Sequence, residues 1–200
     1  MFCTMFEVRI HGRGGQGVVT AAELLSKAAF AEGRHAQAFP SFGSERTGAP
    51  VVAFCRIADQ TIRVREPVVS PDALIVQDAT LLHQVDVFSG LKPGGYVLIN
   101  STATIGQLGL NQIEDAGNRV LTLPATNVAM EHIGRPVPNL IMLAGLAAFT
   151  GLVHLPALIT AMTEHFPGSL GAKNAAAATA AFELVSAHVG LEEAAVAHAD

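Results

Sequence analysis

The stretch that most constrains the fold of this 200-residue chain is "HGRGGQG" at residues 11–17, which places Gly12, Gly14 and Gly17 in a Gly-x-Gly-x-x-Gly pattern. A strand-like run at residues 7–11 precedes the glycines. A segment at residues 17–33 follows them and carries apolar residues at every third or fourth position. This order predicts a strand, a tight turn and a helix, which is the opening unit of an α/β domain.

The rest of the chain continues to alternate between strand-like and helix-like segments. Further strands are predicted at residues 35–39, 51–58, 61–66, 71–78, 96–101 and 119–126, and further helices at residues 79–91, 127–133, 139–150, 155–166 and 172–189. Only Asp59 and Gln60 separate the strands at 51–58 and 61–66, which predicts a β-hairpin. The pattern as a whole predicts one Rossmann-like, three-layer α/β domain over residues 1–190, with a mostly parallel sheet, the β-hairpin as an insert and a helical C-terminal third. Residues 191–200 are small and acidic, and we expect them to form a frayed tail.

Charge and cysteine content exclude several classes of function. The net charge is −5 and there is no run of Lys or Arg, so nucleic acid is not expected as a partner. Cys3 and Cys55 do not form a Cys-x-x-Cys pair and the histidines lack metal-ligand spacing, so we expect no cluster, zinc or other metal site. Only 14% of the residues are charged, against roughly 25% in typical globular domains. This indicates either a surface covered by other chains or a bias toward Ala and Gly.

The apolar segment at residues 137–162 needs a membrane test because it contains no Asp, Glu, Lys or Arg. Pro138, Gly145, Gly151 and Pro156 interrupt it, and no Lys/Arg asymmetry flanks it. We therefore expect two buried helices rather than a membrane span. The N-terminus has no basic region of the kind that opens a signal peptide, and a cytoplasmic location is expected.

The glycine loop suits an anion, because the helix that follows offers free N–H groups and the positive end of its dipole. Gly12 permits a tight turn, Gly14 a close approach of a ligand and Gly17 close packing of the helix on the strand. A dinucleotide site also needs an acid about 20 residues further on, where this chain has Ala38-Phe39-Pro40. Within the same loop, Arg13 and Gln16 are long enough to contact a phosphate or a partner chain. A ligand-free turn is the third possibility.

A second loop, "AFPSFGSERTGAP" at residues 38–50, is more distinctive. Arg46 can hold a phosphate or carboxylate with two hydrogen bonds, and Ser41 and Ser44 can donate others. The alternative is a loop held by its own Glu45–Arg46 pair. At the other strand ends, Asp78 is expected to cap the helix after it. His11 is expected to be structural.

Taken in order, "HGRGGQG", "QAFPSFGSERTGAPVVAFCRI" and "IRVREPVVSPDALIVQDATLL" resemble the gamma subunits of the pyruvate:ferredoxin oxidoreductase family. "PNLIMLAGLAAFTGL" and "KNAAAATAAFELV" extend the resemblance over residues 5 to 188. It implies a Rossmann-like subunit of a multi-chain enzyme that oxidatively decarboxylates a 2-oxoacid, passes the acyl group to coenzyme A and reduces ferredoxin. The form "FPSFGSERTGAP" favours pyruvate, and branched-chain or aromatic 2-oxoacids and 2-oxoglutarate stay open.

The resemblance also implies where the cofactors and partners are. Thiamine diphosphate with Mg²⁺ lies between alpha and beta subunits, [4Fe-4S] clusters lie on beta and delta subunits, and this chain carries no redox centre and no catalytic residue. Its partners are the alpha, beta and delta subunits and, through the complex, ferredoxin.

We expect the two loops to meet at the C-terminal edge of the sheet, near the entry path of coenzyme A, with candidate binding residues Gly12, Arg13, Gly14, Gly15, Gln16, Gly17, Ser41, Ser44 and Arg46. The rival is a purely structural role against the alpha subunit. Alternatives of another class are a stand-alone nucleotide-binding protein and a scaffold with an empty loop.

Overall fold

The computed structural model describes residues 5–41 and 47–197, with side chains described as far as residue 191. Its strands are β1 (Met5–Arg13), β2 (His35–Pro40), β3 (Pro50–Ala58), β4 (Ala73–Val76), β5 (Tyr96–Asn100) and β6 (Arg119–Leu123). Its helices are α1 (Val18–Ala31), α2 (Asn111–Asp115), α3 (Ala125–His132), α4 (Asn139–Thr150), α5 (Leu155–His165) and α6 (Ser169–Ala197). A short 3-10 helix, η1, covers Ala79–His83.

The six strands form one mixed sheet in the order β2-β3-β1-β4-β5-β6. Strands β1, β4, β5 and β6 run parallel, whereas β3 is antiparallel to both β1 and β2. The parallel half follows the order of the Rossmann fold, in which β1 lies beside β4 and the direction of the crossovers reverses between them. The predicted α/β fold class, with a mostly parallel sheet, is therefore confirmed.

The predicted β-hairpin is wrong in its position. Residues 61–66 form no strand, and the strand next to β3 in the chain that pairs with it in antiparallel fashion is β2, which precedes it. The reason is that β3 has both of its edges occupied. Its register with β1 runs from Met5↔Ala58 to Arg13↔Pro50, and β2 covers the opposite edge. No edge of β3 is left for residues 61–66 to pair with.

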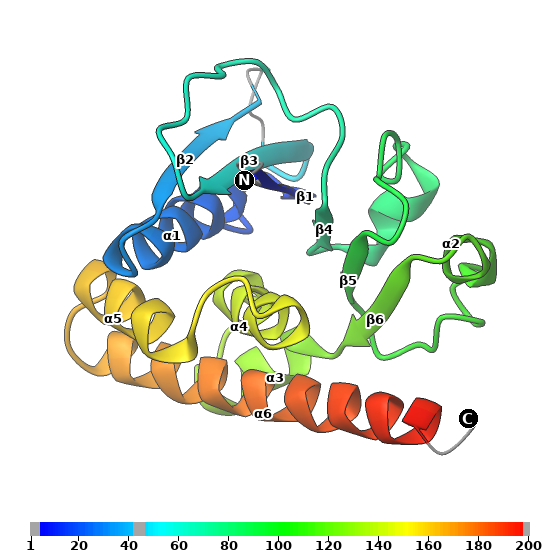
Figure 1. Ribbon diagram of the computed structural model, residues 1–200. Coiled ribbons are helices and arrows are strands. Elements are labelled where there is room, and N and C mark those ends of the chain that lie inside the picture. The colour runs from blue at the N-terminus through cyan, green and yellow to red at the C-terminus, as the bar shows by residue number, and fades with distance from the viewer. Residues whose placement is uncertain (1–4, 42–46, 198–200) are drawn as a thin grey trace.

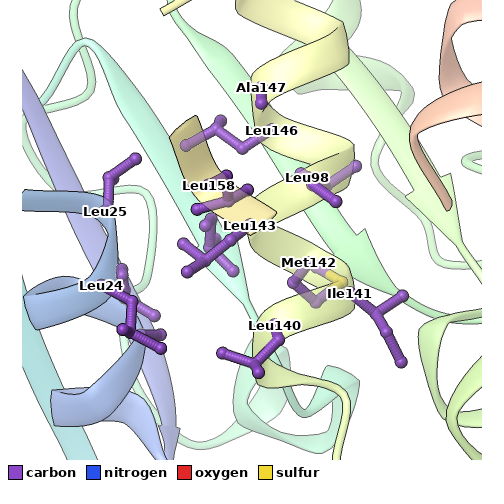
Figure 2. Close-up of a cluster of buried hydrophobic side chains, with 14 of the residues drawn as sticks. Leu24, Leu25, Leu98, Leu140, Ile141, Met142, Leu143, Leu146, Ala147 and Leu158 are labelled. Atoms are coloured by element: carbon purple, nitrogen blue, oxygen red, sulfur yellow. The ribbon is translucent and has the colours of Figure 1, made fainter. Parts of the chain in front are cut away.

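Helices α1, α3, α4, α5 and α6 gather on one side of the sheet, and the long α6 lies across α4 (Figure 1). Their apolar side chains and those of β1, β3 and β4 form the main core. Figure 2 shows Leu140, Leu143 and Leu146 of α4 between side chains of α1, β5 and α5. Helix α4 is buried along nearly its whole length because it has the sheet on one side and α6 on the other. The two helices predicted at residues 137–162 are confirmed, but only α4 is buried along its length, whereas α5 buries one face with Leu158, Ala161 and Met162. Within the described chain no helix is long and apolar enough to cross a membrane.

The opposite face of the sheet is covered more thinly. A second apolar cluster there combines β4, β5 and β6 with η1 and the segment after it, and with α2 and the segment before it, which completes the three layers. The helix predicted at residues 79–91 is wrong beyond His83. The buried guanidinium of Arg9 donates hydrogen bonds to the carbonyl oxygens of Val87 and Ser89, at 2.9 and 2.6 Å. These carbonyl groups therefore point toward β1 and do not accept hydrogen bonds within a helix. This geometry satisfies a buried charge that would otherwise be costly.

The C-terminal third is helical, as predicted, and it ends in one long helix. Helix α6 continues to Ala197, past residue 191 where the sequence predicts a frayed tail, so the backbone of that segment is helical as far as it is described. The domain bounds, 1–190 and 191–200, remain predictions.

Candidate functional site

The glycine loop is folded tightly against its surroundings. Gly17 has a left-handed backbone (φ 71°) at the start of α1, and a Cβ there would collide with the side-chain amide of Asn139. That amide donates a hydrogen bond to the Gly17 carbonyl at 3.3 Å. A Cβ on Gly12 would lie 2.5 Å from Cγ2 of Val18 and 2.9 Å from Oε1 of Gln77. Both positions therefore require glycine, and Gly17 packs against α4, a contact that the sequence pattern did not indicate.

Arg13 is held by other parts of the same chain. Its Nε donates to Oδ2 of Asp78 at 2.8 Å, its Nη1 to the carbonyl of Gly48 at 3.0 Å, and its Nη2 to Thr80 at 2.5 Å and to Gln84 at 3.0 Å. We call these residues the Arg13 network. Arg13 and Asp78 are only 21% and 18% exposed, so this ion pair is partly shielded from water. The network ties the glycine loop to η1 and to the end of the second loop.

Gln16 and Asp78 complete this connection. The Oε1 atom of Gln16 accepts from the backbone N–H of Arg13 at 2.8 Å, and its Nε2 donates to Oδ2 of Asp78 at 3.2 Å. Asp78 also caps η1 by accepting from the backbone N–H of Thr80, as the sequence predicts. Partial burial raises the pKa of Asp78, but hydrogen bonds from Thr80 and Arg13 outweigh it, so the carboxyl pKa lies below its usual value. The group is an anion at neutral pH, which Arg13 requires.

The second loop meets the glycine loop through the backbone. Gly14 donates to the Ala49 carbonyl at 2.9 Å, and Gly48 donates to the Gly14 carbonyl at 3.1 Å. Ser41 is exposed, and its backbone N–H bonds to Val52 at 2.8 Å. Ser44 and Arg46 lie outside the described residues. The segment that comes close to the Gly14 backbone is the second loop, so the described ends of both loops form one unit.

A cavity of about 290 Å³ opens where this unit meets the first turn of α1. Of the candidate residues, the structure brings Arg13, Gly14, Gly15 and Gly17 to its wall, and the remaining lining residues are Val18, Val19, Thr20 and Val51. Gly15 has a positive φ of 94° and open space around it. Backbone N–H groups in the first turn of a helix have no partner within the helix, so this wall favours a negatively charged group.

The crevice that binds dinucleotides in Rossmann folds is occupied by protein here. It lies between the C-terminal ends of β1 and β4, where the crossover direction reverses. In this chain Arg13 is the last residue of β1 and Asp78 follows β4, and their ion pair bridges that position. On its other side, β1 neighbours the start of the antiparallel β3 rather than the end of a parallel strand that could carry a ribose-binding acid. Both features disfavour a stand-alone NAD-binding protein.

Other polar residues at this edge have structural partners. Asn100 donates to the Gln77 carbonyl at 2.9 Å and to Thr126 at 2.8 Å, which links β4, β5 and α3. His11 is 5% exposed and accepts from Nε of Arg9 at 3.1 Å. Burial, reinforced by the nearby Arg9 charge, lowers the pKa of His11 to about 4. It is therefore neutral at physiological pH, and its contacts are structural as the sequence predicts.

The described part of the chain offers no set of side chains that could hold a metal ion or a cluster. No group of three or more His, Cys, Asp or Glu side chains there could hold a metal ion. Cys55 is fully buried in the main core, which raises the pKa of its thiol. Such a thiol is inert as a nucleophile or ligand.

Comparison with known proteins places the chain in a family. Residues 7–184 match the protein-family model "Pyruvate ferredoxin/flavodoxin oxidoreductase". The pyruvate synthase subunit PorC of Methanothermobacter marburgensis is 51% identical over 179 residues, which cover 90% of this chain and 97% of that protein. The common gamma subunit of the pyruvate/ketoisovalerate oxidoreductases of Thermococcus kodakarensis is 47% identical over 178 residues, or 89% and 96% of the two chains.

A solved structure agrees with these relatives. The crystal structure of the pyruvate oxidoreductase subunit PORC of Thermotoga maritima superimposes with a TM-score of 0.78 at 34% identity, and covers 90% of this chain and 96% of that one. The match of family model, sequence and fold extends over nearly the whole chain. On these grounds, the chain belongs to the pyruvate ferredoxin/flavodoxin oxidoreductase family, in the branch formed by gamma (PorC) subunits.

Proposed function

We propose that this chain is the gamma subunit of a cytoplasmic enzyme that converts pyruvate and coenzyme A to acetyl-CoA and CO₂ and passes the released electron pair to ferredoxin. The observation that supports pyruvate is the 51% identity, over nearly all of both chains, to a subunit named for pyruvate synthase. The relative named for both pyruvate and ketoisovalerate keeps a branched-chain 2-oxoacid as the second candidate.

The cofactors of the reaction belong, in this proposal, to the alpha, beta and delta subunits. The described residues of this chain offer no ligand set for a cluster, and the one cysteine among them, Cys55, is buried in the core. Thiamine diphosphate with Mg²⁺ supplies the decarboxylation chemistry, and [4Fe-4S] clusters carry the electrons to ferredoxin. This chain supports the assembly and forms part of the side of the active site that receives coenzyme A.

The 290 Å³ cavity beside the first turn of α1 supports that last assignment. Coenzyme A carries phosphate groups, and a helix N-terminus that is lined by glycine backbone suits them. The Arg13 network leaves little of that guanidinium for a ligand, so Arg13 positions the two loops instead. Charge that contacts the phosphates then comes from Arg46, with Ser41 and Ser44 as further donors.

Two measurements on the assembled enzyme test the proposal. The first is purification through a tag on this chain, followed by assays with pyruvate, 2-oxoisovalerate and 2-oxoglutarate in the presence of coenzyme A and a viologen dye. Activity that is highest with pyruvate supports the assignment. Purification of the chain without partners, in a form that binds NAD(P), would overturn it.

The second measurement compares Arg46→Ala with Arg135→Ala, which alters an exposed arginine outside the two loops. We expect Arg46→Ala to raise the KM for coenzyme A about tenfold, the loss of one charge-assisted contact to a phosphate, with the KM for pyruvate unchanged. Weaker assembly with an unchanged KM for coenzyme A would show that the loops serve only as a docking surface.

A further inference from the structure

Two cavities meet at Phe30 on the edge of the sheet far from the glycine loop. One, of about 500 Å³, lies between α1 and α5. The other, of about 450 Å³, lies between β2 and residues 61–65. Phe30 and Ala36 line both cavities, so the two form one continuous depression, which we call the Phe30 groove. Figure 1 shows the segment between β3 and β4 passing along the outer side of β2.

The centre of the groove is an exposed aromatic side chain. Phe30 is 74% exposed although it stands in the same helix as the fully buried Leu24 and Leu25. Aromatic side chains, Phe among them, are enriched in the buried centre of protein interfaces. A partner that covers Phe30 would therefore gain more binding free energy than one that covers the polar surface around it.

The backbone beside Phe30 is also without a pairing strand. Strand β2 is the outer strand of the sheet, and in the described chain no backbone hydrogen bond joins it to residues 61–65. The cavity between them separates the two segments instead. A free strand edge can accept an extended segment from another chain.

The charge of the groove selects the partner. Lys27, Arg63 and Arg65 line it, are exposed, and form no ion pair with any described residue. Glu164 is the one acid that lines these two cavities. Asp59 lines an adjoining cavity together with Arg63, but it is paired with Arg34 at 3.3 Å. In a chain of net charge −5, this basic concentration contrasts with the rest of the surface. Complementary charge requires an occupant rich in Asp and Glu.

We propose that the Phe30 groove binds an acidic, extended segment of a partner subunit, which lies along β2, places an apolar side chain against Phe30 and directs carboxylates toward Lys27, Arg63 and Arg65. The proposal depends on this chain working within a multi-subunit enzyme, as proposed above. It is independent of the coenzyme A site, because none of the residues of the Phe30 groove lines the 290 Å³ cavity.

Crosslinking in the co-expressed complex tests the contact directly. A benzoylphenylalanine at position 30 is compared with one at Leu191 of α6, which is 71% exposed. The C-terminal end of α6 lies on the opposite side of the molecule from α1 and α5 (Figure 1). We expect position 30 to crosslink to an acidic peptide of one partner subunit, identified by mass spectrometry. A crosslink to a second copy of this chain or to a segment without Asp and Glu, or no crosslink in a complex that has assembled, would overturn the proposal.

Charge reversal tests the chemistry with a matched control. Arg63→Glu/Arg65→Glu changes the charge by the same amount as Arg135→Glu/Lys173→Glu, whose residues are exposed, have no ion pair in the described chain and line neither cavity. We expect the groove variant, and not the control, to raise the Kd of assembly about tenfold at low salt, with the difference shrinking as salt is added.

Phe30→Ala should raise the same Kd about 30-fold, as expected for a central aromatic contact. Equal effects of the two charge-reversed variants would refute the basic groove as the determinant. If wild-type chain purifies with no partner at all, the proposed function fails first. If the partners co-purify and the groove variants assemble normally, only this inference fails.

Discussion

Replacing Gly17 by Ala should destabilise the fold more than replacing Gly15, although both glycines have positive φ angles of 71° and 94°. An alanine held in the left-handed region costs about 1 kcal/mol at either position. At Gly17 the new methyl group also collides with the amide of Asn139, which is 5% exposed and hydrogen-bonded to the Gly17 carbonyl. Displacing that amide leaves a buried polar group without its partner, which costs about 2 kcal/mol more.

The expected loss in free energy of unfolding is therefore about 3 kcal/mol for Gly17→Ala and about 1 kcal/mol for Gly15→Ala. With a denaturant slope of about 2 kcal/mol per molar urea, the midpoints should fall by about 1.5 M and 0.5 M. Urea titrations followed by far-UV circular dichroism measure both values. Gly15 is a matched control because a Cβ there would have nothing within 4 Å.

A double-mutant cycle isolates the contact with Asn139. In an Asn139→Ala background the collision is absent, so Gly17→Ala should cost only the backbone term of about 1 kcal/mol. The coupling between the two positions should therefore be about 2 kcal/mol. Equal costs for Gly15→Ala and Gly17→Ala, or a coupling near zero, would refute the view that α4 fixes the third glycine of the loop.

Three further predictions concern other parts of the molecule. Arg13→Ala should lower the free energy of unfolding, measured by urea titration, by about 2 kcal/mol because it removes the partly buried ion pair with Asp78. Arg13→Lys should restore less than half of that loss, because a lysine cannot reproduce the several hydrogen bonds of the guanidinium. Full rescue by Lys would show that the charge alone matters. The pKa of His11 in the folded chain, about 4, lies below its usual 6.5, so the unfolded chain takes up the proton first as the pH falls. The free energy of unfolding should therefore be level above pH 6.5 and fall by about 3 kcal/mol toward pH 4. His11→Gln should flatten that pH dependence in thermal melts, and an unchanged slope would assign it to other groups. Leu143→Ala should cost about 3 kcal/mol in the same titrations, since Leu143 is fully buried in the middle of α4, and a cost below 1 kcal/mol would mean that the core closes over the gap.

The alternation of strands and helices was predictable because apolar periodicity records which faces are buried. The β-hairpin was misplaced because the local signal, two strand-like runs separated by Asp59 and Gln60, carries no information on whether an edge is free. β1 and β2 occupy the two edges of β3. Which strands pair with the two edges of β3 is decided by the tertiary structure and cannot be seen in a short stretch of sequence.

The meeting of the two loops was predictable from the sequence, but the contacts that hold them were not. The sequence indicated that the glycine loop and the 38–50 loop come together, and their backbone bonds through Gly14 agree. It did not indicate that Arg13 would be committed to Asp78, a residue 65 positions away. Neither did it indicate that Asn139 would pack on Gly17, 122 positions away, since an Asn at the start of a helix is an ordinary sequence feature.

The burial of α4 has a consequence for how the protein is made. Helix α4 ends at Thr150, but α6, which covers it, begins only at Ser169 and is therefore synthesised later. On the ribosome, the almost entirely apolar helix α4 therefore stays uncovered until α6 has been synthesised, at a chain growth of about 5–20 residues per second. During that interval the nascent chain displays the kind of surface that chaperones bind. Truncations or slow codons between residues 150 and 185 should thus reduce the yield of folded protein more than equivalent changes near the N-terminus.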